Sequence, residues 1–74
     1  MHYKIKTPIV RFYNQRGDGI AETKRPADLV GLASGQQISP FTTARGKVLW
    51  EVSYVEEIDS QYTFVHIKDL GYIQ

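Results

Sequence analysis

The alternation of apolar and polar side chains in residues 47–73 is the feature that most constrains the fold of this chain. A period of two residues is expected of a half-buried β-strand. The acidic stretch 56–60 interrupts this period, and residues 62–68 resume it. We therefore predict a β-hairpin, then a tight turn at residues 68–71 and a short final strand at residues 72–74. In the first hairpin strand, one face carries Val48, Trp50, Val52 and Tyr54, and the other carries Leu49, Glu51, Ser53 and Val55.

The remainder of the chain predicts short strands separated by turns. Residues 3–13 form the first strand, in which Pro8 marks an edge, a bulge or a change of register because it has no N–H to donate. Residues 14–19 have turn composition, residues 20–25 are short and polar, and residues 36–43 form a strand broken by Pro40. Residues 26–33 fit either a short strand or a single helical turn. About five strands without a long helix predict an all-β fold, a small five-stranded barrel whose closure limits exposed edges.

Length and composition favour one small domain, residues 1–74. The chain has 74 residues and no cysteine, so its stability must come from the packing of β-branched and aromatic side chains or from a partner. No window approaches the roughly 18 apolar residues of a membrane span. The N-terminus begins with Met, so the chain could be either a complete small protein or a domain of a longer one. It lacks the long apolar run of a secretory signal, so we expect a cytoplasmic location.

The order of these features resembles that of bacterial SH3-like domains. The matching segments are Val10-Arg11 in an opening strand, residues 32–38 as a turn and strand, residues 49–52 as the strand with tryptophan, and Gly71-Tyr72-Ile73 at the end. The chain departs from the family where Leu49 takes the leading tryptophan position, and where Tyr72 replaces a final tryptophan. Residues 14–25 also lack the acidic cluster and tyrosine pair with which eukaryotic SH3 domains hold proline-rich peptides. The resemblance implies a small barrel that binds protein or cell-wall peptide and is not an enzyme.

No residue pattern points to catalysis, a cofactor or a metal. A structural metal site usually has about four Cys or His ligands, whereas this chain has two histidines, His2 and His66, and no cysteine. Ser53 or Ser60 with His66 lacks the local context of a nucleophile–base pair. The carboxylates of residues 56–59 lack the spacing of an EF-hand and fit a solvated hairpin loop. We therefore expect no enzymatic activity, no cofactor and no metal.

The aromatic residues give the best lead to a function. Nine of the 74 residues are aromatic, more than a barrel of this size can bury, so the others should line a surface. Exposed Tyr and Trp often mark recognition patches, because rigid rings offer a large contact area. The alternative is that the rings cover the core with only their hydroxyl groups in water. On the first interpretation we predict a protein- or peptide-binding site of Arg11, Tyr13, Trp50, Tyr54 and Tyr72.

Two other functions stay open. A nucleic-acid binder would stack bases on sheet aromatics beside Lys4, Lys6, Arg11, Lys24 and Arg25. The net charge of +1, and the concentration of six acidic residues in residues 26–74, count against that function. A structural protein of a phage or bacterial assembly would instead form a homo-oligomer through an edge strand.

The position of Trp50 separates two versions of the core. The resemblance places Leu49 inside and Trp50 on the surface, which requires a bulge because Leu49 and Val52 differ in parity. Alternation alone places Trp50, Val52 and Tyr54 together in the core. We follow the resemblance and predict an exposed or half-exposed Trp50. The predicted core comprises Val10, Ile38, Leu49, Val52, Val65, Ile67 and Ile73.

Overall fold

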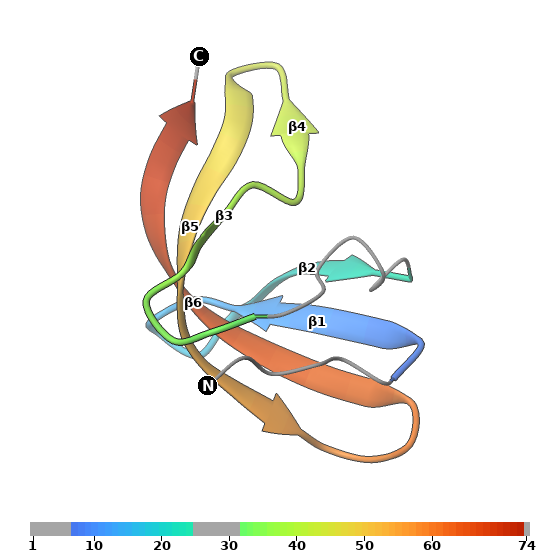
Figure 1. The fold of residues 1–74 in the computed structure, drawn as a ribbon. Helices are drawn as coiled ribbons and strands as arrows, with labels where there is room; N and C mark the ends of the chain where they lie inside the picture. Colours follow the sequence, from blue (N-terminus) through green and yellow to red (C-terminus); the bar gives the residue numbers. More distant parts are fainter. Residues whose placement is uncertain (1–6, 25–31, 74) are drawn as a thin grey trace.

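A computed structural model describes residues 7–24 and 32–73, and these residues form strands and turns without a helix (Figure 1). All strands belong to one open sheet in the order β2-β1-β6-β5-β3, with β4 paired to β5 off this path. The all-β prediction is confirmed, whereas the closed five-stranded barrel is not, because the sheet is open and has six strands. The strands are β1 (Ile9–Tyr13), β2 (Gly19–Thr23), β3 (Gln37–Ile38), β4 (Thr42–Thr43), β5 (Gly46–Glu57) and β6 (Tyr62–Ile73).

Two predicted segments lie partly outside the described residues. The strand predicted at residues 3–13 is described only from Thr7, and β1 begins at Ile9, directly after Pro8. Of the ambiguous segment 26–33, only Leu32 and Ala33 are described. The strand predicted at residues 36–43 divides into β3 and β4, with Pro40 between them.

The predicted hairpin is present as β5 and β6, two antiparallel strands of 12 residues each. The tight turn predicted at residues 68–71 is wrong, because β6 continues without reversal to Ile73. Three steps along β6, from Asp69 to Tyr72, face two steps along β5, from Trp50 to Val48. The extra residue is a β-bulge. Gly71 has a φ of 100° there, and its N–H donates a 2.8 Å hydrogen bond to Asp69 Oδ1.

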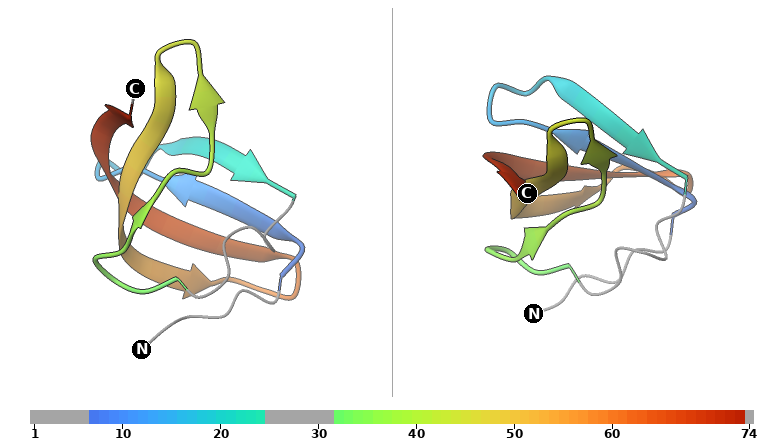
Figure 2. Two further views of the ribbon diagram at one scale, coloured as in Figure 1. Left: turned by 45° about the horizontal axis from the view of Figure 1, so that its top comes forward. Right: turned by 90° about the horizontal axis from the view of Figure 1, so that it is seen from above.

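The long hairpin joins two regions of the sheet. The first, the four-stranded half, consists of β2, β1, residues 62–67 of β6 and residues 52–57 of β5, with β1 parallel to β6 and antiparallel to β2. The second, the arm, consists of residues 46–51 of β5, residues 68–73 of β6, and β4. Both strands of the hairpin bend between these regions, so that the arm curves away from β1 and β2 (Figures 1 and 2).

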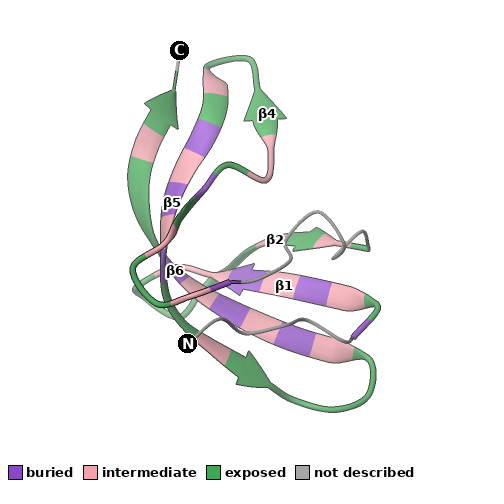
Figure 3. Ribbon diagram, viewed as in Figure 1, coloured by how far each residue is buried: buried purple, intermediate pink, exposed green. Residues whose placement is uncertain are grey.

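The core lies on the inner side of this bend, and Figure 3 marks its buried residues along the strands. Five of the seven predicted core residues are buried, whereas Leu49 is half-buried and Ile73 is 44% exposed. The prediction of a surface Trp50 is wrong. This side chain is 6% exposed, and its ring centroid lies 5.1 Å from that of Phe12. The buried apolar residues are Val10, Phe12, Leu32, Ile38, Val48, Trp50, Val52, Val65 and Ile67.

The bulge near Trp50 belongs to β6, so β5 keeps its period of two from Val48 to Val52. Trp50 therefore lies on the same buried face as these two valines. A second bulge lies further along β5, where the two steps from Val52 to Tyr54 face one step of β6. This bulge reverses the faces of β5. Tyr54 therefore lies on the outer face, and Val55 packs against the core. Alternation alone, which grouped Tyr54 with the core, is wrong at this residue.

Hydrogen bonds from the segment before β3 hold the backbone at this second bulge. The N–H of Val52 donates to Gln36 O at 2.8 Å, and the N–H of Gly35 donates to Val52 O at 2.7 Å. The Ser34 hydroxyl donates to Ser53 O at 2.9 Å. The change of face at Tyr54 is therefore fixed by backbone pairing on the other side of β5.

Candidate binding surface

The outer face of the four-stranded half gathers side chains from β5, β6, β1 and β2 into two rows. Paired residues on neighbouring strands share a face of a sheet. The registers place Tyr54, His66, Tyr13 and Gly19 in one row. They place Glu56, Phe64, Arg11 and Glu22 in the next row. We name the rings of Tyr13, Tyr54, Tyr62, Phe64 and His66 the aromatic face.

The rings of the aromatic face are in continuous contact. The His66 ring lies between two tyrosine rings. Its centroid is 4.0 Å from that of Tyr54, at an interplanar angle of 11°, and 5.6 Å from that of Tyr13, at 25°. The ring centroid of Phe64 lies 4.7 Å from that of Tyr13 and 6.5 Å from that of Tyr62. Tyr54 is 53% exposed, and the other four residues are half-buried. Stacked rings have few free torsions, so this surface offers a large contact area at a small entropic cost.

His66 is positioned by these stacking contacts. Its Nε2 atom is buried, and no described residue supplies a hydrogen-bond partner for it. A shallow hollow next to His66 and Tyr54 is lined by the turn residues Asn14, Gln15 and Gly17 and by Ser53 and Ile67. Asn14 Oδ1 accepts hydrogen bonds of 3.0 Å from the N–H groups of Arg16 and Asp18, which fixes the turn beside the hollow.

Gly19 determines how far the Tyr13 ring extends over β2. A Cβ atom at residue 19 would lie 3.4 Å from Tyr13 Cε1. Because glycine has no side chain, the ring lies over the backbone of β2. A second hollow there is bounded by Arg11, Tyr13, Ile20 and Glu22. The row formed by the rings of Tyr54, His66 and Tyr13 therefore has a hollow at each end, one beside Tyr54 and one over Gly19.

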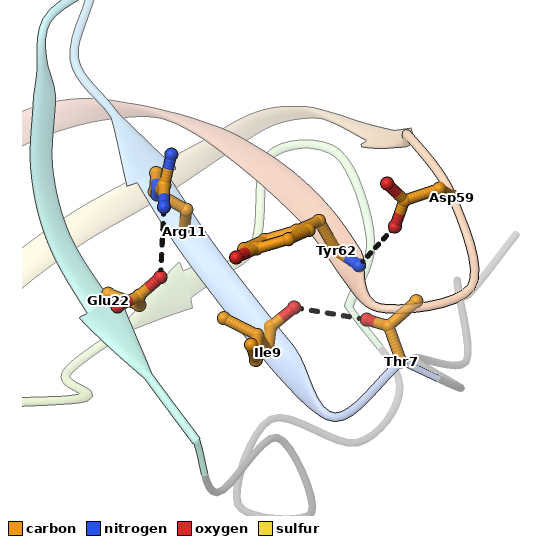
Figure 4. Close-up of polar contacts among 6 residues, drawn as sticks. All are labelled: Thr7, Ile9, Arg11, Glu22, Asp59 and Tyr62. Atoms are coloured by element: carbon orange, nitrogen blue, oxygen red, sulfur yellow. Dashed lines mark hydrogen bonds and ion pairs between the residues drawn. The ribbon is translucent and has the colours of Figure 1, made fainter.

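Arg11 supplies the positive charge of this surface. Its guanidinium carbon lies 5.2 Å from the ring centroid of Tyr62 and 5.7 Å from that of Phe64. Arg11 Nη2 donates a 3.1 Å hydrogen bond to Glu22 Oε1, which makes an ion pair across β1 and β2 (Figure 4). Hydrogen bonding to Tyr13 and to Glu22 raises the pKa of Arg11 above its ordinary value. The cation is thus permanently charged and already paired.

The ends of β1 and β6 are fixed by polar contacts near Tyr62 (Figure 4). The Thr7 hydroxyl donates to Ile9 O at 3.1 Å and shares a buried 2.8 Å hydrogen bond with the Thr63 hydroxyl. The Asp59 carboxylate accepts hydrogen bonds from the N–H groups of Gln61 and Tyr62 at 2.8 and 2.9 Å. These contacts hold the loop from which Tyr62 enters the aromatic face.

The structure brings together three of the five predicted site residues. Arg11, Tyr13 and Tyr54 lie on the outer face of the four-stranded half. Trp50 lies in the core, and Tyr72 is 45% exposed but lies in the arm, opposite Val48. The prediction did not include Tyr62, Phe64 and His66 in the site. Their alternation with Thr63, Val65 and Ile67 placed them on one face, but not beside β1.

Neither a metal centre nor a membrane span is found in the part of the chain that the structure describes. No three His, Asp or Glu side chains there are grouped to hold a metal ion. No helix within residues 7–24 and 32–73 is long and apolar enough to cross a membrane. Comparison of the chain with models of known families, with curated proteins and with solved structures gives no match. The surface is therefore interpreted from its own geometry.

Proposed function

We propose that the protein is a non-catalytic binding module that recognises a protein or peptide segment through the aromatic face. The observation that carries this proposal is the gathering of five rings from three strands, with Tyr54 53% exposed at the end of the stack. Residues of this kind dominate the energetics of many protein interfaces. The two hollows beside the ring row give space for partner side chains.

The charges of this surface favour a polypeptide over a polyanion. Arg11 is paired with Glu22, and the outer face also carries Glu56 opposite Phe64. A site for phosphates would need uncompensated Lys or Arg. The second candidate, a single-stranded nucleic acid, is favoured by the guanidinium of Arg11 over two rings, since bases stack on such platforms.

The relation to bacterial SH3-like domains is part of the proposal. The bending of two long strands around one core supports it. The binding surface proposed for this chain is formed by β1, β5 and β6 and does not use Trp50, which is buried. The proposed binding site is thus the outer face of three strands, and the strand that carries the tryptophan contributes only a part of it.

The proposal is tested with peptides selected from a random linear 12-residue library on the immobilised protein. The affinity of the selected peptides is then measured by fluorescence anisotropy. Tyr54→Ser should weaken binding by about 30-fold, equivalent to the ~2 kcal/mol typical of an interface hot spot. Tyr72→Ser is the matched control, because Tyr72 is also exposed but lies in the arm. Equal losses for the two variants, or no selection of any peptide, would refute the proposed site.

Single-stranded DNA is titrated in parallel over a range of salt concentrations. Phosphate contacts give an affinity that falls steeply with salt, whereas an aromatic peptide site shows a shallow dependence. Tight DNA binding with a steep salt dependence and a requirement for Tyr54 would favour the second candidate.

A further inference from the structure

Tyr54 has one ring face covered and one open. His66 stacks on the first at 4.0 Å and 11°. The side chain nevertheless remains 53% exposed, the highest value among the large exposed apolar residues of the described chain. Among the strands described, β5 pairs only with β6 from Tyr54 to Glu57, because the pairing with β3 is at Trp50 and Glu51. No described strand therefore lies beside the open face of this ring.

Glu56 lies two residues beyond Tyr54 on the same outer face, opposite Phe64. Side chains two residues apart on one strand are separated by about 6.5–7 Å. The Glu56 side chain is exposed, and no described residue forms a hydrogen bond or ion pair with its carboxylate. Arg11 is two strands away across Phe64, roughly 10 Å at ordinary strand spacing, and is paired with Glu22.

The same surface contains one complete arrangement of a cation, a ring and a carboxylate. Arg11 lies over Tyr62 and Phe64 and pairs with Glu22 at 3.1 Å. Tyr54 and Glu56 repeat the ring and the carboxylate of that arrangement without its cation. A cation over a tyrosine ring is attracted by the negative face of the ring, and a nearby carboxylate adds a charged hydrogen bond.

We propose that Tyr54 and Glu56 hold an arginine or lysine side chain of the bound partner segment. The cation packs on the open face of Tyr54 and donates to the Glu56 carboxylate. Arginine fits best, because its guanidinium is planar and stacks on rings while donating to a carboxylate. The exposed carboxylate of Asp59 lies in the loop after β5 and adds to the negative potential that attracts a basic segment. This inference rests on the proposed function, since it specifies the partner of the same surface.

The experiment uses the peptides selected from the random library. We expect the selected sequences to be enriched in arginine and lysine. Glu56→Gln should weaken their binding about tenfold, a size typical of one charged contact. Glu57→Gln is the matched control, because it removes the same charge one residue further along, opposite Thr63 on the other face. That variant should change the affinity by less than about twofold.

A second measurement replaces the arginine of the best peptide by citrulline, a neutral analogue of similar shape. Citrulline should cost about tenfold on the native protein and less on Glu56→Gln, because the ion pair with the carboxylate is then already lost and only the contact with the Tyr54 ring remains. Thermal unfolding of each variant confirms that the fold is retained.

The outcomes separate this inference from the proposed function. Selected peptides without basic enrichment, or equal effects of Glu56→Gln and Glu57→Gln, overturn the cation site. The proposed function then stands if Tyr54→Ser still weakens binding by about 30-fold and Tyr72→Ser does not. Failure to select any peptide overturns both.

Discussion

The two regions joined by the β5–β6 hairpin have similar sequence patterns and different surroundings. In the four-stranded half, Val10, Phe12, Val52, Val65 and Ile67 are 0–1% exposed. In the arm, Val48 and Trp50 are 7% and 6% exposed, and Tyr72, opposite Val48, is 45% exposed. The difference follows from neighbouring strands: β1 flanks β6 only as far as His66, and no described strand continues along that edge beside residues 68–73. The alternation of side chains predicts which residues share a face of the sheet, but the neighbouring strands determine whether that face is buried.

Each strand of the β5–β6 hairpin also contains one bulge, and the two bulges have opposite consequences. The bulge of β5 turns Tyr54 onto the outer face, where His66 and Tyr13 complete a stack. The bulge of β6 interrupts the free edge of the arm, and the Asp69 carboxylate accepts a hydrogen bond from the N–H of Gly71. Bulges on edge strands disfavour pairing with another chain. The four-stranded half is thus the better candidate for a binding surface. In the arm, the bulge instead disfavours pairing of the free β6 edge with another chain.

The largest effect is expected where the four-stranded half is most tightly packed. Val52→Asp would bury a charge without a partner at a residue that is 1% exposed. We expect this variant to be unfolded, as measured by circular dichroism and the absence of a cooperative thermal transition. Ser53→Asp is the control, because Ser53 is exposed at the bulge and should tolerate a carboxylate. A folded Val52→Asp variant would contradict the assigned inner face.

Trp50→Ala tests the core at the start of the arm. Loss of this ring and of its packing on Phe12 and Phe41 should cost about 3–5 kcal/mol of the free energy of unfolding. Tyr72→Ala, also in the arm, should cost less than about 1 kcal/mol because its side chain is exposed. Urea denaturation measures both variants. Tryptophan fluorescence of the native protein should be blue-shifted and resist iodide, and red-shifted, quenched emission would disagree with a buried Trp50.

Gly71→Ala tests the bulge that replaces the predicted turn. Gly71 has a φ of 100°, which L-residues rarely adopt, and a Cβ there would meet no atom within 4 Å. The cost is therefore backbone strain alone, about 1–2 kcal/mol of unfolding free energy. Denaturant titration measures it. An unchanged stability would mean that residues 69–72 pair with β5 without the bulge.

The sequence predicted the features of this fold that depend on neighbouring residues in the chain. The period of two in β5 and β6 is local, so the hairpin and most of the core could be predicted. The bulge at Ser53 carries no residue signal, and the combination of Asp69 and Gly71 suits a turn as well as a bulge. The parallel pairing of β1 with β6 joins Tyr13 to His66, which are far apart in the chain. The aromatic face depends on that pairing, so only two of its rings, Tyr13 and Tyr54, were predicted as site residues, together with Arg11 beside them.

The smallest effect on stability is expected for Gly19→Ala, the counterpart of Gly71→Ala in the four-stranded half. Gly19 does not have a positive φ, and a Cβ would lie in ordinary contact, 3.4 Å from Tyr13 Cε1. Alanine also restricts the unfolded chain, so the free energy of unfolding should stay equal or rise by up to about 1 kcal/mol. Gly19→Val adds branches beyond Cβ, which must displace the Tyr13 ring. That variant should keep the cooperative unfolding transition but lose affinity for the selected peptides. Full affinity in Gly19→Val would remove Tyr13 from the binding surface, whereas destabilisation by Gly19→Ala would show that the ring packs more tightly over β2 than the 3.4 Å contact indicates.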